Sequence, residues 1–336
     1  MKILFITRLF LPHVGGVEKQ LNELSKRLIK KGFEITIITE KFNETLKDRE
    51  TINGIKVVRF SYPKIKFLGL FHIWLWFLRN IYYIKQADIV HTHGVFVWYW
   101  PLRLLFPKKP IYTTFHGWEG IYPIPRKNIL LRKIAAKLSL GNICVGKFIE
   151  KHYGIKAGKI IYTSVDMPRK VKLTKEKKSL VYVGRLDEDT GLQQILEALS
   201  YLKGFKVDFC GDGPLRKECE RYGTIHGFVN PGPYFEKAMI CLSPGHTSIL
   251  EAFTYRCLVI TTYNNPVKGD YLKMTPFSKW IVVRKSPREM AEKIKYYSKY
   301  PEKAKPMIEK AYNWVKTQNW DNATNFYLEL WGLKQK

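Results

Sequence analysis

The sequence predicts an α/β protein with two Rossmann-like β/α/β domains, because of its length and its two successive series of alternating strands and helices. The chain has 336 residues, more than the size at which a single core keeps growing, so two domains are expected. Each series opens with a buried strand that precedes a glycine-containing loop and a helix, KILFITRLF from residue 2 and SLVYVGR from residue 179. Repeated units of this kind build parallel sheets.

In the first series, a helix over VEKQLNELSKRLIKKG follows the glycine loop. Its apolar residues Val17, Leu21, Leu24 and Leu28 recur at helical spacing, and Gly32 supplies the stop. Further strands are expected at FEITIIT, KVVRF, ADIVHTH, PIYTTFH and NICVG. We assign residues 1–165 to this N-terminal domain.

The second series predicts strands at FKVDFCGDGP, IHGFV, AMICLSP and CLVITT. Helices are expected over LQQILEALSYL, from Leu215, and from about Ser248. The polar, charged stretch DMPRKVKLTKEKKS between the two series is typical of a linker. We place the linker at 166–178, the C-terminal domain at 179–310, and a C-terminal helix that crosses back to the N-terminal domain at 311–336.

The chain carries a formal charge of +28, which favours anionic partners such as acidic lipids or phosphorylated small molecules. No nucleic-acid-binding motif is recognisable, so no nucleic-acid partner is expected. The five cysteines form no C-x-x-C pair, which favours a reducing, cytoplasmic compartment over a disulfide framework.

One apolar run, FLGLFHIWLWFL at residues 67–78, is too short to span a bilayer. It fits a helix buried against the N-terminal sheet, or an interfacial helix on an anionic membrane. The two alternatives are compatible if one face of the helix packs on the sheet and another face contacts the membrane. For the second, we expect residues 64–85 to dock, through the basic residues Lys64, Lys66, Arg79 and Lys85 and the aromatic residues Trp74, Trp76, Tyr82 and Tyr83.

Several loops have the composition of phosphate-binding turns. Gly15 and Gly16 lie between a strand and a helix start, where backbone N–H groups and the helix dipole suit a phosphate. Gly184 and Arg185 follow a strand end, where the forked donors of an arginine suit a diphosphate. The same motifs also fit a plain tight turn and a salt-bridged loop arginine.

The second domain offers further candidates. Asp187 and Asp189 form a D-x-D pattern, which we attribute to a helix start rather than to a metal site. Gly211 and Gly213 allow a nucleotide to approach the backbone. Three further candidates lie in SPGHTSILEAF: Thr247 or Ser248 as a helix cap, and Glu251 one turn later as a partner for ribose hydroxyls.

Three histidines end strands of the first domain. His91 and His93 share a strand face, but no third ligand has metal-site spacing, so no metal is expected. His116 precedes a glycine at a strand end, where it can contact a bound sugar.

In this order, the segments resemble the retaining glycosyltransferase family 4, of the GT-B fold. The resemblance covers nearly the whole chain and rests on the Gly-Gly loop, ADIVHTHG, TFHG, NICVGKFIEKHYG, IYTSVD, VGRL, GDGPLRKECE, HGFV, SILEAF, LVITT and NWDNATNFYLELW. It implies that two Rossmann-like domains face a central cleft, with the acceptor bound by the first and a nucleotide-sugar donor by the second.

The resemblance also implies roles for single residues. Gly16 would lie against the donor phosphate or sugar, Arg185 would bind the diphosphate, Glu251 the ribose and His116 the transferred sugar. The reaction would be a hexosyl-type transfer with retention and without a metal cofactor. Because no carboxylate is obviously placed as a nucleophile near His116, the implied route is a front-face mechanism in which the donor phosphate assists the acceptor's proton loss. The acceptor would be a sugar or lipid-linked sugar at the cytoplasmic membrane face.

Two positions depart from the family pattern. Thr190 stands where the family usually has a lysine that pairs with the arginine on the diphosphate, and Ser243 stands where a glutamate usually contacts the donor sugar. Losing both would weaken donor binding by a few kcal/mol, if charged hydrogen bonds contribute their usual amounts. A weakly active or inactive sugar-nucleotide- or glycan-binding relative therefore remains the alternative.

Overall fold

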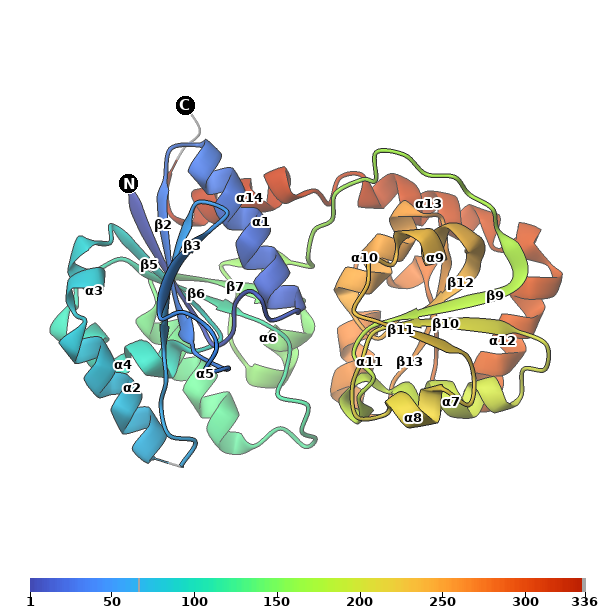
Figure 1. Ribbon diagram of the computed structural model, residues 1–336, viewed down its shortest axis with the longest axis horizontal. Coiled ribbons are helices and arrows are strands. Elements are labelled where there is room, and N and C mark those ends of the chain that lie inside the picture. The colour runs from blue at the N-terminus through green and yellow to red at the C-terminus, as the bar shows by residue number, and fades with distance from the viewer. Residues whose placement is uncertain (66, 334–336) are drawn as a thin grey trace. The chain divides into compact units, whose positions relative to one another are not determined.

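The computed structural model describes residues 1–65 and 67–333 and divides the chain into two compact units. The first unit contains Met1–Ile161 together with the chain from Trp320 onward, and the second contains Tyr162–Asn319. Figure 1 shows each unit as a twisted sheet with helices on its faces.

The described residues of the first unit form an eight-stranded sheet in the order β3-β4-β2-β1-β5-β6-β7-β8. All neighbours are parallel except the edge strand β3, which is antiparallel to β4. In chain order the strands are β1 (Lys2–Thr7), β2 (Glu34–Glu40), β3 (Arg49–Ile52), β4 (Ile55–Phe60), β5 (Ile89–His93), β6 (Ile111–Phe115), β7 (Gly141–Val145) and β8 (Lys159–Ile161).

Helices cover both faces of this sheet, as expected for parallel strands joined by crossovers. They are α1 (Gly16–Lys30), α2 (Leu68–Arg79), α3 (Tyr82–Gln86), α4 (Phe96–Leu105), α5 (Arg126–Leu138), α6 (Phe148–Tyr153) and α14 (Trp320–Leu330). The apolar stripe of α1 is buried at Leu21, Leu24 and Leu28. The C-cap residue of this helix, Lys31, is followed by Gly32 at φ +86°. That left-handed conformation favours glycine and ends the helix where the sequence predicts.

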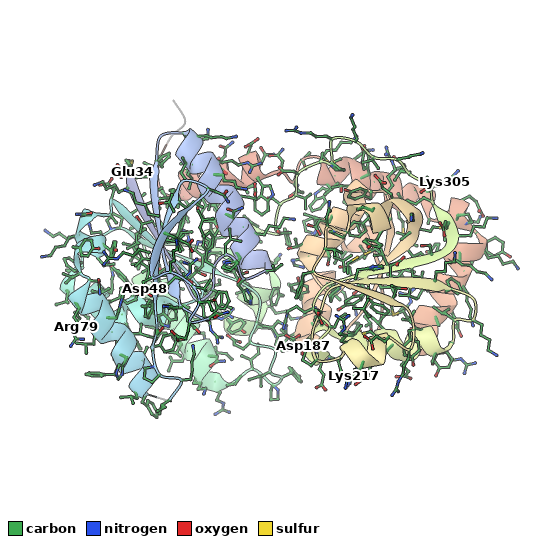
Figure 2. All side chains as sticks on the ribbon, in the orientation of Figure 1. Glu34, Asp48, Arg79, Asp187, Lys217 and Lys305 are labelled. Carbon is green, nitrogen blue, oxygen red and sulfur yellow. The ribbon has the colours of Figure 1, made fainter. Side chains whose placement is uncertain are left out.

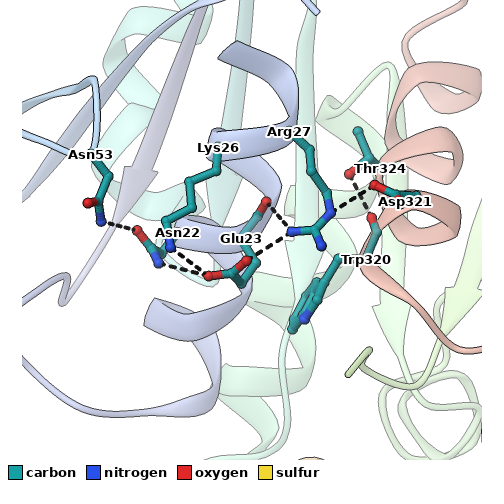
Figure 3. Close-up of polar contacts among 8 residues, drawn as sticks. All are labelled: Asn22, Glu23, Lys26, Arg27, Asn53, Trp320, Asp321 and Thr324. Atoms are coloured by element: carbon teal, nitrogen blue, oxygen red, sulfur yellow. Dashed lines mark hydrogen bonds and ion pairs between the residues drawn. The ribbon is translucent and has the colours of Figure 1, made fainter. Parts of the chain in front are cut away.

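The last helix, α14, packs against α1 within the first unit. Figure 3 shows the polar part of this contact, in which the Arg27 guanidinium donates to Glu23 on its own helix and to Asp321 on α14. Tyr327 of α14 is completely buried and accepts a hydrogen bond from Gln20 at 2.8 Å. Apolar burial around Tyr327, Leu328 and Trp331 fixes this helix to the core of the first unit.

The described residues of the second unit form a six-stranded, fully parallel sheet in the order β11-β10-β9-β12-β13-β14. Its strands are β9 (Glu176–Val183), β10 (Lys206–Cys210), β11 (Thr224–Gly227), β12 (Ala238–Leu242), β13 (Leu258–Thr262) and β14 (Val282–Arg284). Its helices are α7 (Leu192–Ser200), α8 (Arg216–Cys219), α9 (Gly232–Lys237), α10 (His246–Thr254), α11 (Pro266–Lys273), α12 (Pro287–Lys299) and α13 (Lys305–Val315), with 3₁₀ turns η1 (Glu188–Thr190), η2 (Ser278–Trp280) and η3 (Pro301–Lys303).

Both sheets contain a point where the strand order reverses. The chain moves outward from β1 in one direction through β2 and in the other through β5, and it does the same from β9 through β10 and β12. Ligands of open α/β sheets bind outside the carboxyl ends of the strands at such points. In the first unit this edge follows Thr7 and His93, and in the second it follows Val183 and Leu242.

Some local predictions were wrong. The helix expected to be capped by Thr247 or Ser248 begins earlier, with Gly245 as its N-cap and no side-chain capping bond, because the Ser248 hydroxyl instead bonds back to the Gly245 carbonyl. The tail contains two helices, α13 in the second unit and α14 in the first, rather than one. Within residues 1–65 and 67–333, the structure contains no helix long and apolar enough to cross a membrane.

Candidate functional site

The loops after β9, β10 and β12 meet at the carboxyl edge of the second sheet. The backbone N–H of Gly184 donates to Cys210 at 3.2 Å, and that of Leu186 donates to Asp212 at 3.0 Å. Pro244, in the loop after β12, lies against Gly184. The predicted residues Gly184, Arg185, Gly211 and Gly213 are therefore brought together at one edge.

The glycines of this edge are needed by the protein's own packing. A Cβ on Gly211 would overlap the carbonyl oxygen of Gly184, and one on Gly213, at φ +155°, would overlap that of Leu186. Gly184 has φ +158°, and its Cβ would lie 2.7 Å from a ring carbon of Pro244. Sequence reasoning assigned these glycines to ligand approach, and the structure adds that the loops cannot pack together without them.

Arg185 is half-exposed and is held by the two aspartates of the D-x-D pattern. Its guanidinium donates to Asp187 at 3.0 Å and to Asp189 at 2.7 Å. Position 190 is unsuited to a ligand contact, because the Thr190 side chain is buried and its hydroxyl bonds to the Asp187 carbonyl and to Tyr182. Figure 2 labels Asp187 in this loop.

Buried hydrogen bonds hold the loop after β12 in place. Ser243 is completely buried and its hydroxyl bonds to that of Ser248 at 2.6 Å, while its carbonyl accepts from Thr261. Thr247 lies 3.5 Å from the Thr163 hydroxyl. Glu251 lies on α10 after these residues and is partly exposed. Ser243 thus serves the loop rather than a bound sugar.

Three residues at this edge escaped the sequence analysis. The His246 ring stacks on Tyr271 at 3.8 Å with an interplanar angle of 6°, and its backbone N–H donates to the Tyr271 hydroxyl. Burial lowers the pKa of His246 to about 3. Lys268 of α11 is also buried, and its ammonium donates to the carbonyl of Pro244. The chain is so rich in basic residues that its sequence does not single out Lys268 as a site residue.

In the first unit, the Gly15-Gly16 loop follows β1, and Gly15 is the N-cap of α1. Gly15 makes room for the buried carboxylate of Glu18, because a Cβ there would overlap that carboxylate. The Glu18 carboxylate accepts a hydrogen bond from His13 Nδ1 at 2.9 Å. An acidic group therefore already lies beside the helix start for which the sequence predicts a phosphate.

His91, His93 and His116 form a stacked row at the carboxyl ends of β5 and β6, with ring centroids 4.9 and 5.1 Å apart. Burial lowers the pKa of His91 and His93 well below the usual range and that of His116 to about 3, so all three rings are neutral at pH 7. No group of three possible metal ligands occurs among the residues that the structure describes.

The hydrogen bonds of this row assign the position of the protons. Trp331 Nε1–H can only donate, so His91 Nδ1 accepts and His91 Nε2 carries the proton toward Thr114. His93 Nδ1 and His116 Nε2 share a bond of 2.9 Å, while His93 Nε2 is buried with no partner among the described residues. Because an orphaned N–H is rarer than an orphaned acceptor, His93 donates through Nδ1, and His116 carries its proton on Nδ1.

His116 lines a pocket of about 180 Å³ within the first unit. Glu119 and Arg132 line the same pocket, and their side chains pair at 2.8 Å. The other Glu119 oxygen accepts from the Tyr153 hydroxyl, over whose ring Arg132 lies at 3.9 Å. The expectation that no carboxylate is placed near His116 therefore missed Glu119, whose two oxygens are both engaged.

Solved structures with the same fold identify the class. Sucrose-phosphate synthase from Thermosynechococcus elongatus matches with a TM-score of 0.77 at 15% identity, over 99% of this chain and 100% of that one. HepE from Anabaena, solved with UDP and glucose, matches with a TM-score of 0.72 at 14% identity over 98% of each chain. The protein has the GT-B fold.

Two family models match consecutive parts of the chain. "Glycosyltransferase Family 4" matches residues 14–169, and "Glycosyl transferases group 1" matches residues 165–314. Together the two matches run from residue 14 to residue 314, and the chain belongs to these glycosyltransferases.

Curated relatives match at low identity over most of the chain or at higher identity over a part of it. A glycosyltransferase from Methanocaldococcus jannaschii is 22% identical over 94% of this chain and 96% of its own length. The GPI3 subunit of the phosphatidylinositol N-acetylglucosaminyltransferase from Saccharomyces cerevisiae is 35% identical over 25% of this chain. The aligned segment spans only 20% of the yeast protein's length.

Proposed function

We propose that this glycosyltransferase takes its sugar from a nucleotide-sugar donor bound at the carboxyl edge of the second sheet. The observation that carries the proposal is the convergence there of Gly184, Arg185 and the loops bearing Gly211 and Gly213. Arg185 engages the diphosphate by exchanging its two aspartates for phosphate oxygens, and Glu251 binds the ribose. The solved HepE complex with UDP and glucose supports a donor of this chemical class.

Release of nucleoside diphosphate tests this proposal. UDP-, GDP-, ADP- and TDP-sugars are incubated with the protein, and the free diphosphate is measured with and without a chelator. We expect release from the sugars of one base, unchanged by the chelator, as the family resemblance implies. Binding of a sugar nucleotide without any release, even with acceptors added, would favour the inactive relative.

The pocket beside His116 is the proposed place of the acceptor's reacting group, with the transferred sugar against the ring. His116 acts as a neutral Nδ1–H donor to the sugar rather than as a base, because burial keeps its pKa at about 3. Glu119 is held by Arg132 and Tyr153, so it is not available as a nucleophile. We therefore infer transfer with retention by a front-face route, in which the departing phosphate assists proton loss from the acceptor. NMR of the product decides, since an inverted anomeric centre would exclude this route.

We further propose that the acceptor is lipid-linked and that the first unit docks on the cytoplasmic face of an anionic membrane. Helix α2 has one face buried at Ile73 and Phe77 and one exposed at Leu68 and Phe71, and the residue directly before the helix, Phe67, is exposed as well. Phe67 and Phe71 are 77% and 59% exposed. Figure 2 shows Arg79 at the end of the same helix, directed away from the sheet. An exposed apolar face with a basic flank suits an anionic interface.

The structure changes which residues of the 64–85 segment should insert. Trp76 stacks on Phe60 with ring centroids 4.5 Å apart, and the Trp74 indole donates to the Val97 carbonyl, so both serve the fold. Lys64 pairs with Glu40, which reduces its contribution. The remaining predicted contacts are Arg79, Lys85 and the exposed Tyr82 with the half-buried Tyr83, and Lys66 lies outside the described residues.

Liposome flotation tests the docking. Wild type is expected to float with vesicles containing anionic lipid at low salt and to release at high salt. Phe71→Ser should weaken flotation, whereas Phe228→Ser, at an equally exposed position of the second unit (58%), should not. If wild type stays soluble at low salt, a soluble acceptor becomes the better proposal.

A further inference from the structure

The charges of the loop after β9 pose a problem for a diphosphate. Arg185 is paired with Asp187 and Asp189, and Glu188 lies between them, so this short loop carries three acidic side chains against one basic side chain. Position 190 supplies no cation, because the Thr190 hydroxyl is bonded inside the loop. A diphosphate bound here therefore needs a second positive charge from another element.

Lys268, on α11, is the cation that the fold brings to this edge. Its side chain is 93% removed from solvent, and its ammonium donates to the carbonyl of Pro244, the residue that packs on Gly184. The ammonium also lies 4.7 Å from the centroid of the Tyr271 ring. Asp189 and Arg185 are both close enough to act on its charge. Lys268 thus lies beneath the point where the loops after β9 and β12 meet.

A structural role explains this arrangement poorly. An ammonium has three donors, and one carbonyl and one ring are its described contacts. No carboxylate forms an ion pair with it among the residues of the structure's described ranges. Burial lowers the pKa of Lys268 to about 8, which Asp189 offsets in part and Arg185 reinforces. A buried cation that is so incompletely partnered is expected where an anion binds.

We propose that Lys268 supplies the second positive charge of the donor diphosphate site, beside Arg185. The inference rests on the proposed donor site and adds to it a residue on a different element. When the diphosphate binds, Arg185 exchanges its aspartates for phosphate oxygens. The ammonium of Lys268, which contacts the loop after β12, stabilises the negative charge of the same diphosphate. Because a nucleoside diphosphate carries more negative charge than the monophosphate, losing this cation should weaken diphosphate binding more.

The test compares nucleoside diphosphates with the matching monophosphates. Calorimetric titration of the full chain with UDP and UMP, GDP and GMP, and ADP and AMP gives the affinity ratio of each pair. We expect wild type to prefer one diphosphate, and Lys268→Met to lose at least about tenfold of that diphosphate's affinity while the monophosphate changes little. Lys273→Met is the matched control on the same helix, since Lys273 is exposed and bonds to Tyr263.

The outcomes separate the two levels of the proposal. If wild type binds none of the nucleotides, the donor site itself is wrong, and this inference falls with it. If wild type prefers a diphosphate and Lys268→Met keeps the same ratio, the role of Lys268 is overturned while the donor site stands. Should Lys268→Met fail to fold, wild type alone decides. Its preference for the diphosphate should fall between pH 7.5 and 9.5, as Lys268 loses its proton, and a constant preference would overturn the inference.

Discussion

Replacing Lys268 by methionine should make the protein more stable. The pKa of the lysine falls from its ordinary 10.5 to about 8 on folding, and this difference corresponds to about 3 kcal/mol of unfavourable charge burial at pH 7. Methionine has a similar length and no charge. It leaves the Pro244 carbonyl without this donor, which costs about 1–2 kcal/mol. The net expectation is a gain of about 1–2 kcal/mol.

The pH dependence gives this prediction a sign that can be checked. Below pH 8 the lysine is protonated in both the folded and the unfolded chain, so the difference between variant and wild type is constant. Between pH 8 and 10.5 the unfolded chain binds the proton and the folded chain does not, so wild-type stability rises relative to the variant. The charged groups acting on Lys268 are Asp189, which raises its pKa, and Arg185, which lowers it.

Urea unfolding of both proteins at pH 7 and at several values up to pH 10 measures the effect. Lys273→Met should change the free energy of unfolding by less than about 0.5 kcal/mol, as expected for an exposed residue. A Lys268→Met variant that is less stable than wild type by more than 1 kcal/mol at pH 7 would show that the contacts of Lys268 stabilise the fold. A stability difference that does not shrink between pH 8 and 10 would contradict the lowered pKa.

Three further predictions concern both units. Arg185→Ala should reduce turnover by at least about a hundredfold with little change in unfolding free energy, because the guanidinium is half-exposed and its role is to stabilise charge on the departing diphosphate; near-normal steady-state turnover would refute this role. Gly211→Ala should destabilise the second unit by about 3 kcal/mol or more in denaturant unfolding, since its Cβ would overlap the Gly184 carbonyl, and an unchanged midpoint would disprove the tight contact. The His116 ring should stay neutral with its proton on Nδ1 down to pH 5 in nitrogen-correlated NMR spectra, and His93→Phe should mix its tautomers; a ring that titrates near pH 6.5 would contradict the burial argument.

Regular periodicity made much of the fold predictable. Leu21, Leu24 and Leu28 recur at helical spacing and are buried in α1, and β1 contains a continuous apolar run at residues 3–6 because helices cover both sheet faces. The boundary of α10 was less predictable. Thr247 and Ser248 are residue types that commonly cap helices, but the Ser248 hydroxyl forms hydrogen bonds to Ser243 and to the Gly245 carbonyl. Residue spacing in the sequence does not reveal these contacts.

The candidate site was predictable only where a residue follows a strand directly. Gly184, Arg185 and His116 come immediately after strand ends, and parallel strands bring such ends to one edge. Lys268 lies within a helix and reaches the edge only because α11 packs beneath Pro244. Glu119 lines the His116 pocket and pairs there with Arg132, which lies on α5, a helix that begins several residues after Glu119. Such contacts depend on helix packing, which the sequence pattern does not specify.

The central claim is that a sugar nucleotide binds at the carboxyl edge of the second sheet and is cleaved there. The most direct measurement is thermal unfolding of wild type and Arg185→Ala with UDP-, GDP-, ADP- and TDP-sugars, because a ligand that binds only the folded state raises the midpoint. We predict that the sugars of one base raise the wild-type midpoint, that Arg185→Ala loses most of this rise, and that the same sugars release diphosphate in the transfer assay. No rise with any sugar nucleotide at millimolar concentration, or an equal rise in the variant, would contradict the account.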